Sequence, residues 1–177
     1  MRRIISAICL VAITSPLLAS EASDQFFNNL KQLCGKTIQG KSVYPANKDD
    51  SFYGKTLIMT VKSCSDTELR IPFSVGKDKS RTWILTRTEQ GLLFKHDHRH
   101  EDGTPDELTM YGGYANSNGT AWSQSFPADD ATKVLVPKGE TNIWHLTIDK
   151  ENKQFIYYLE RHQKPRFKAV FDLKEKG

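Results

Sequence analysis

Residues 142–173 read NIWHLTIDKENKQFIYYLERHQKPRFKAVFDL, and this stretch decides the fold class of the chain. Three runs rich in Ile, Val, Tyr and Phe are separated by short polar turns at 149–153 and 163–165. In the first run apolar and polar residues alternate, so that Trp144 and His145 would lie on opposite faces of a strand. Short turns pair consecutive strands as antiparallel hairpins. We therefore predict a β-meander in this part of the chain.

Segments of the same composition recur upstream, again separated by polar turns. About ten strands with little helix would leave two open sheet edges, and closure into a barrel removes both edges. A two-sheet sandwich is the alternative, although its crossovers are longer than most turns here. We therefore predict an all-β fold, an antiparallel up-and-down β-barrel of about ten strands with a short N-terminal helix. The predicted strands are Thr37–Tyr44, Lys55–Cys64, Glu68–Val75, Arg81–Thr88, Leu92–His100, Glu107–Tyr114, Thr120–Phe126, Asn142–Ile148, Gln154–Arg161 and Arg166–Leu173.

The first 22 residues have the pattern of a secretory signal peptide that is later cleaved. Arg2 and Arg3 supply a charged start, and Ile4–Leu18 forms the apolar run. Small residues follow, which predicts cleavage after Ala22, with cleavage after Ser20 as the close alternative. The pattern predicts a protein that is periplasmic or secreted.

Residues 23–177 are expected to form a single domain. A short helix capped by Ser23 or Asp24 would open this domain, and Gly35 would end the helix. No later stretch is apolar enough to span a bilayer. The formal net charge is +4, and the basic residues are interleaved with acidic ones, which argues against a nucleic-acid partner.

Cys34 and Cys64 are the two cysteines that remain once the signal peptide is removed. An even pair in an exported chain indicates a disulfide bond, and two buried free thiols are the alternative. If the first two predicted strands form a hairpin, the bridge would tie the opening helix to that hairpin.

Three of the five histidines, His96, His98 and His100, alternate within five residues. On a strand they would share one face with Leu92 and Phe94, while Lys95, Asp97 and Arg99 would form a solvated opposite face. The pattern predicts a site inside the barrel. Imidazole is a common metal ligand, so His96 and His98 are candidate ligands of a divalent metal or a haem. The alternative is a polar barrel interior, or a pocket for an organic ligand.

The residues that face the histidines depend on the turn after Thr88. A turn of even length would place Arg81 and Trp83 beside the histidines and would suit an anionic or aromatic ligand, whereas an odd turn would place Thr82 and Ile84 there. The sequence leaves both registers open.

Residues 111–114 read Tyr-Gly-Gly-Tyr, and paired glycines inside a strand indicate a bend, a bulge or the close approach of a ligand. Tyr111 is therefore included among the candidate ligand-binding residues. In the preceding acidic turn Asp102, Asp106 and Glu107 offer carboxylates that suit calcium, although a plain acidic turn shaped by its Gly and Pro is the preferred interpretation. We find no motif of a serine nucleophile, a zinc protease or a phosphate loop.

Residues 35–40 read Gly-Lys-Thr-Ile-Gln-Gly and open the strand meander after the short helix. In this arrangement the chain resembles the calycin superfamily, which includes lipocalins, fatty-acid-binding proteins and nitrobindin-type haem barrels. The third position of the lipocalin Gly-x-Trp opening is here Thr37. Residues 95–103 and 110–113 also resemble a group of bacterial secreted proteins of unassigned function.

The resemblance implies a barrel that holds one small ligand. The expected function is therefore the binding of a small molecule, with His96, His98, His100, Arg81, Trp83 and Tyr111 lining the pocket. The first alternative is a metal- or haem-binding protein that uses His96 and His98. The second alternative is a metal-assisted hydrolase or an isomerase.

Overall fold

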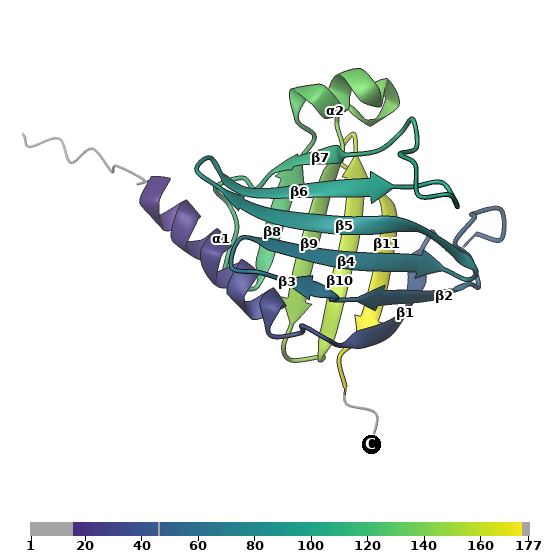
Figure 1. The fold of residues 1–177 in the computed structure, drawn as a ribbon, viewed down its shortest axis with the longest axis horizontal. Helices are drawn as coiled ribbons and strands as arrows, with labels where there is room; N and C mark the ends of the chain where they lie inside the picture. The colour runs from purple at the N-terminus through teal and green to yellow at the C-terminus, as the bar shows by residue number, and fades with distance from the viewer. Residues whose placement is uncertain (1–15, 46, 175–177) are drawn as a thin grey trace, which may run out of the picture.

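The computed structural model of the chain describes residues 16–45 and 47–174. Antiparallel strands follow one another in the sheet order β7-β6-β5-β4-β2-β1-β11-β10-β9-β8, and the short β3 pairs with β4 (Figure 1). The all-β barrel prediction is therefore confirmed. The strands are β1 (Thr37–Tyr44), β2 (Thr56–Thr60), β3 (Ser63–Cys64), β4 (Glu68–Val75), β5 (Asp78–Thr88), β6 (Gly91–His98), β7 (Tyr111–Tyr114), β8 (Ser123–Pro127), β9 (Ile143–Asp149), β10 (Gln154–Arg161) and β11 (Lys164–Asp172).

The two terminal strands of this order, β7 and β8, nearly close the barrel. They form no continuous ladder, but two main-chain hydrogen bonds join the segments at the seam. Asn116 N donates to Ser125 O at 2.9 Å, and Asp129 N donates to Gly112 O at 2.9 Å. The sheet therefore has almost no exposed edge, which explains why a chain of this many strands need not aggregate through edge pairing.

Gly113 lies where the seam is tightest. A Cβ atom added there would overlap the carbonyl oxygen of Pro127, so this glycine permits a close approach of main chain to main chain. We expect Gly113→Ala to lower the free energy of unfolding by about 1–3 kcal/mol, because the seam must open. Urea unfolding measures this loss, with Ser117→Ala at an exposed position between β7 and β8 as the control. An unchanged stability would contradict the prediction.

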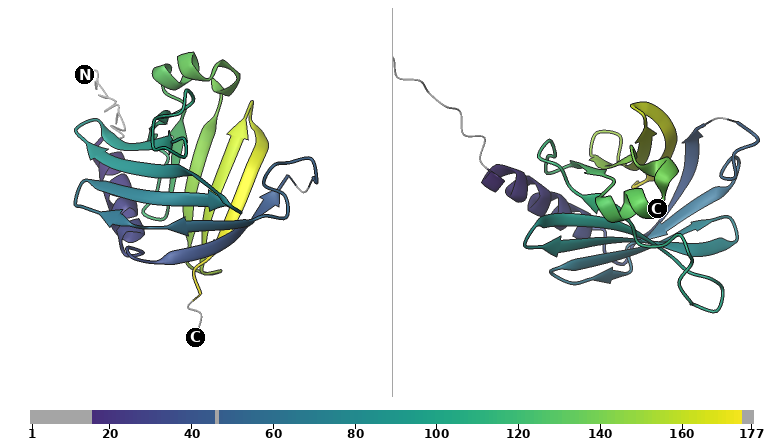
Figure 2. Two further views of the ribbon diagram at one scale, coloured as in Figure 1. Left: turned by 45° about the vertical axis from the view of Figure 1, so that its right-hand side comes forward. Right: turned by 90° about the horizontal axis from the view of Figure 1, so that it is seen from above.

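The long connection between β8 and β9 holds two short helices, α2 (Asp130–Leu135) and the 3₁₀ helix η1 (Pro137–Gly139). The Asp129 side chain caps α2 by accepting from Thr132 N at 2.8 Å. The Thr132 hydroxyl donates to Gly112 O at 2.8 Å and accepts from Gly112 N at 2.7 Å. These bonds hold α2 against β7 beside one opening of the barrel (Figure 2).

The helix α1 (Pro16–Lys31) lies against the strand ends at the other side of the barrel (Figure 1). Its side chains Phe26, Phe27 and Leu30 are fully buried in the barrel core. The prediction that Ser23 or Asp24 caps this helix is wrong, because α1 already begins at Pro16. Most of residues 16–22 favour helix, so the chain need not break there. Most of the predicted signal peptide, residues 1–15, lies outside the described residues.

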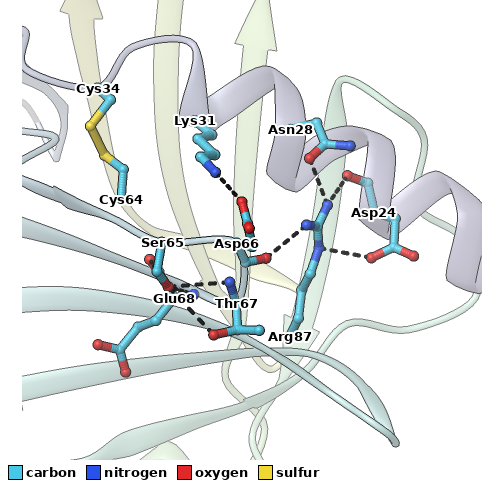
Figure 3. Close-up of polar contacts among 10 residues, drawn as sticks. All are labelled: Asp24, Asn28, Lys31, Cys34, Cys64, Ser65, Asp66, Thr67, Glu68 and Arg87. Atoms are coloured by element: carbon cyan, nitrogen blue, oxygen red, sulfur yellow. Dashed lines mark hydrogen bonds and ion pairs between the residues drawn. A yellow bond between two sulfur atoms is a disulfide. The ribbon is translucent and has the colours of Figure 1, made fainter.

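Polar contacts and one disulfide attach α1 to the barrel (Figure 3). Arg87, near the end of β5, donates to Asp24 O at 2.9 Å and to Asn28 Oδ1 at 2.8 Å. Lys31 pairs with Asp66 in the turn before β4 at 2.7 Å. The predicted Cys34–Cys64 disulfide is confirmed and links the segment after α1 to β3. This end of the barrel is therefore covered by a helix that is fixed in place.

Candidate functional site

The opposite end of the barrel holds a cavity of about 420 Å³. Strand β5 runs between the two ends of the barrel. Arg87, near one end of this strand, binds α1, while Arg81, toward the other end, lines the cavity. The volume suits a small organic molecule. Its lining residues come from strands and from three connections, the segments 45–55, 99–110 and 128–142. They are Asp50, Ser51, Phe52, Phe73, Arg81, Trp83, His96, His98, Asp106, Leu108, Tyr111, Thr132, Val136, Asn142, Trp144, Tyr157, Leu159, Arg161, Arg166 and Phe167.

The turn between β5 and β6 has two residues, 89 and 90, since Thr88 pairs with Gly91. In this register Trp83 pairs with His96, and Arg81 pairs with His98. The even-turn register is therefore the one that the chain adopts. Of the six predicted ligand-binding residues, the structure brings five together around the cavity. They are Arg81, Trp83, His96, His98 and Tyr111.

His96 is buried, and both nitrogens of its ring have hydrogen-bond partners. Nδ1 lies 3.1 Å from the carbonyl oxygen of Tyr111, which only accepts, so Nδ1 carries the proton. Nε2 then accepts from the Tyr157 hydroxyl at 3.0 Å. Burial lowers the pKa of His96 to about 3. The imidazole is therefore neutral at pH 7. Its two hydrogen bonds join Tyr111 and Tyr157 beside the cavity.

His98 and Tyr111 form the polar edge of the cavity. The Tyr111 hydroxyl lies 3.0 Å from Nε2 of His98. Partial burial lowers the pKa of His98, and the positive charge of Arg81 lowers it further. Burial raises the pKa of Tyr111 to about 12. Both groups are therefore mostly neutral at pH 7, whereas Arg81 forms an ion pair with Asp78 at 2.5 Å.

Stacked aromatic rings form one wall of the cavity. The Trp83 ring lies between Phe73, at a centroid distance of 4.5 Å, and Tyr157, at 4.8 Å. Phe52 from the segment 45–55 packs on Phe167 of β11 at 4.8 Å. Such a wall offers planar apolar surface to a ligand.

Arg161 and Arg166 are site residues that the sequence reasoning missed. Arg161 Nε donates to Asn142 Oδ1 at 2.8 Å. Both arginines line the cavity from the two strands of the β10–β11 hairpin. Burial lowers the pKa of Arg161, and the positive charge of Arg166 lowers it further. Neither arginine takes part in an ion pair with any of the described residues. The short turn at 163–165 was the available signal, because it places both arginines at one barrel end.

The structure does not bring His100 into the cavity. β6 ends at His98, and His100 is exposed on the following turn, where its N–H donates to Thr104 O at 2.9 Å. The predicted solvated face of this strand is also wrong at Asp97, which is 4% exposed. Its Oδ1 accepts from Arg99 at 2.9 Å and from the Thr109 hydroxyl at 3.2 Å, because the segment 99–110 folds back over this face.

The predicted metal pair, His96 and His98, has no third ligating side chain beside it in the described part of the chain. Both ring nitrogens of His96 are already hydrogen-bonded, and Nε2 of His98 is bonded to Tyr111. An ion at this pair would have to displace these contacts. The predicted calcium set is also divided, since Asp102 instead accepts from Thr104 N at 2.9 Å.

A serine, a histidine and a carboxylate line up on the outer face of the barrel. Ser125 Oγ lies 2.8 Å from Nδ1 of His145, and Glu160 Oε2 lies 3.8 Å from Nε2 of the same ring. These residues line neither the cavity nor a second, more open hollow of about 950 Å³ near the start of β1.

Two further findings concern the chain as a whole. Among residues 16–45 and 47–174, no helix is both long and apolar enough to cross a bilayer. Comparison of the chain with protein-family models, with curated proteins and with solved structures found no match.

Proposed function

We propose that this protein is an exported binding protein of calycin-like architecture that holds one small ligand in the open end of its barrel. The observation that carries the proposal is the cavity of about 420 Å³, which combines a stacked aromatic wall with two arginines that have no carboxylate partner. Export to the periplasm or the exterior is supported by the N-terminal sequence pattern and by the disulfide, which is typical of an oxidising compartment.

The charges of the cavity favour a ligand with an anionic group. Asp50 and Asp106 also line it, but each accepts a hydrogen bond from the main chain of its own loop, from Phe52 N and Leu108 N respectively, both at 2.9 Å. Two like charges that line one cavity repel each other less when an anion binds near them, and guanidinium groups bind carboxylates and sulfonates through charge-assisted hydrogen bonds. The ligand class is therefore a planar apolar molecule with one acidic group.

Binding of anilinonaphthalene sulfonate, a planar aromatic anion, tests the proposal through the change in dye fluorescence. We expect the change Arg161→Gln with Arg166→Gln to weaken binding about tenfold or more, because charge-assisted hydrogen bonds are lost. The matched control is Lys164→Gln with Lys168→Gln, which removes two charges from the same hairpin outside the cavity and leaves the affinity nearly unchanged.

Phenylnaphthylamine, which has a similar aromatic body without the acidic group, separates the two parts of the proposal. Its affinity should not change in the arginine variant and should fall in Trp83→Leu, which removes part of the stacked wall. If neither dye binds the folded protein, or if both bind equally well to every variant, the cavity is not the binding site.

A further inference from the structure

The turn after β6 gathers three ligating side chains, of which only Asp106 also lines the binding cavity. They belong to His100, Asp106 and Glu107, and one ligand atom of each lies within 4.8 Å of the other two. The group is the only set of three or more such side chains found among the described residues. We propose that these three residues form a binding site for a divalent transition-metal ion of the zinc type at the rim of the barrel.

The local backbone explains why residues six and seven positions apart in the chain meet. Arg99 and Pro105 form a bridge, Asp106 N donates to His98 O at 3.0 Å, and His100 N donates to Thr104 O at 2.9 Å. In this small antiparallel hairpin His100 and Asp106 share one face as diagonal neighbours. Gly103 N closes the turn by donating to His100 O at 3.0 Å. The positions of His100 and Asp106 are therefore set by main-chain hydrogen bonds, and Glu107 follows directly after Asp106.

The side chains themselves are available to an ion. Neither the His100 ring nor the Glu107 carboxylate has a hydrogen-bond or ion-pair partner within the described residues, and both are exposed. Asp106 Oδ1 accepts from Leu108 N at 2.9 Å, which leaves its other carboxylate oxygen for a metal. The exposed side chains can close the remaining distance by rotation.

The ligand chemistry selects the class of ion. One imidazole nitrogen and two carboxylates suit zinc and its neighbours in the transition series, while calcium prefers a shell of oxygen atoms alone. Three protein ligands leave a coordination position open. Asp106 also lines the cavity, so an ion held there would add positive charge at the rim.

Isothermal titration of the untagged protein with zinc chloride, and separately with calcium chloride, tests the site. We expect one zinc ion per chain and at least tenfold weaker zinc binding in His100→Ala and in Glu107→Gln. His162→Ala is the matched control, because His162 is also exposed but lies in the β10–β11 turn. Zinc should bind this control as it binds the unchanged protein, and calcium should bind at least tenfold more weakly than zinc.

Three outcomes would overturn the site: no zinc binding by the folded protein, equal binding by His100→Ala, or loss of binding in His162→Ala. Circular dichroism of each variant shows whether the barrel is intact. Since both substituted side chains are exposed and make no hydrogen bond, the variants should fold like the unchanged chain. Dye binding in metal-free buffer reports on the cavity separately, so failure of the metal site leaves that test intact.

Discussion

Acidification from pH 7 to pH 4 should remove about 3 kcal/mol of folding free energy through His96 alone. The ordinary pKa of a histidine is near 6.5, and burial in the folded protein lowers the pKa of His96 to about 3. Between these two values the unfolded chain binds the proton and the folded chain does not. The stabilising contribution is therefore complete above pH 6.5 and is lost as the pH falls toward 3.

Urea unfolding of the unchanged protein and of His96→Gln at pH 7 and pH 4 measures this contribution. Glutamine does not titrate, and its amide can still donate and accept inside the network of Tyr111 and Tyr157. The variant should be less stable at pH 7 but should lose about 3 kcal/mol less on acidification. His100→Gln is the control, since that ring is exposed, and it should follow the unchanged protein. An identical loss in all three proteins would show that His96 is not the buried group responsible.

The barrel could be predicted because it is specified by short segments of the sequence, namely the strand patterns and the turns between them. Each short turn specifies a hairpin, and the two-residue turn after Thr88 sets the register that brings Trp83 to His96. Once the register is known, the alternation of β6 places His96 inside the barrel. For this reason Arg81, Trp83, His96 and His98 meet at the cavity, and Tyr111 joins them because β7 pairs it with His96.

The residues whose positions were not predicted correctly are placed by contacts between distant segments, which no local sequence pattern encodes. His100 leaves the strand face because Asp97 and Thr109, twelve residues apart, bond to each other and fold the intervening segment back over β6. Phe52 belongs to a connection with no strand or helix pattern, and its place is fixed by packing on Phe167 of the last strand. Such long-range packing appears only when the closed barrel is assembled, because β1 must first pair with β11.

The two ends of the barrel are lined by different kinds of side chain. α1 fills one end with fully buried apolar side chains, whereas the other end is lined by arginine, histidine and tyrosine side chains around an aromatic wall. An end held by a fixed helix keeps the strands in register, and in the proposed function the open end would exchange its ligand without unfolding of the core. On this view, loss of the attachment of α1 should affect stability far more than dye binding.

Removal of the bridge in Cys34→Ser with Cys64→Ser tests this division of roles. The bridge closes a loop with a sequence separation of 30, and the chain-entropy model gives about 3–4 kcal/mol for a loop of this length. We expect a loss of that size in the free energy of unfolding in urea, while the affinity for anilinonaphthalene sulfonate at low urea stays within about twofold, because neither cysteine lines the cavity.

Reduction of the bond provides the internal control for this prediction. Dithiothreitol should lower the stability of the unchanged protein by a similar amount and should leave the double serine variant unaffected, since it has no bond to reduce. A loss below about 1 kcal/mol would mean that the contacts of Arg87 and Lys31 hold α1 without help from the bridge. If the double serine variant keeps its fold but binds the dye much more weakly, the two ends of the barrel are coupled. The position of α1 would then also determine the shape of the cavity.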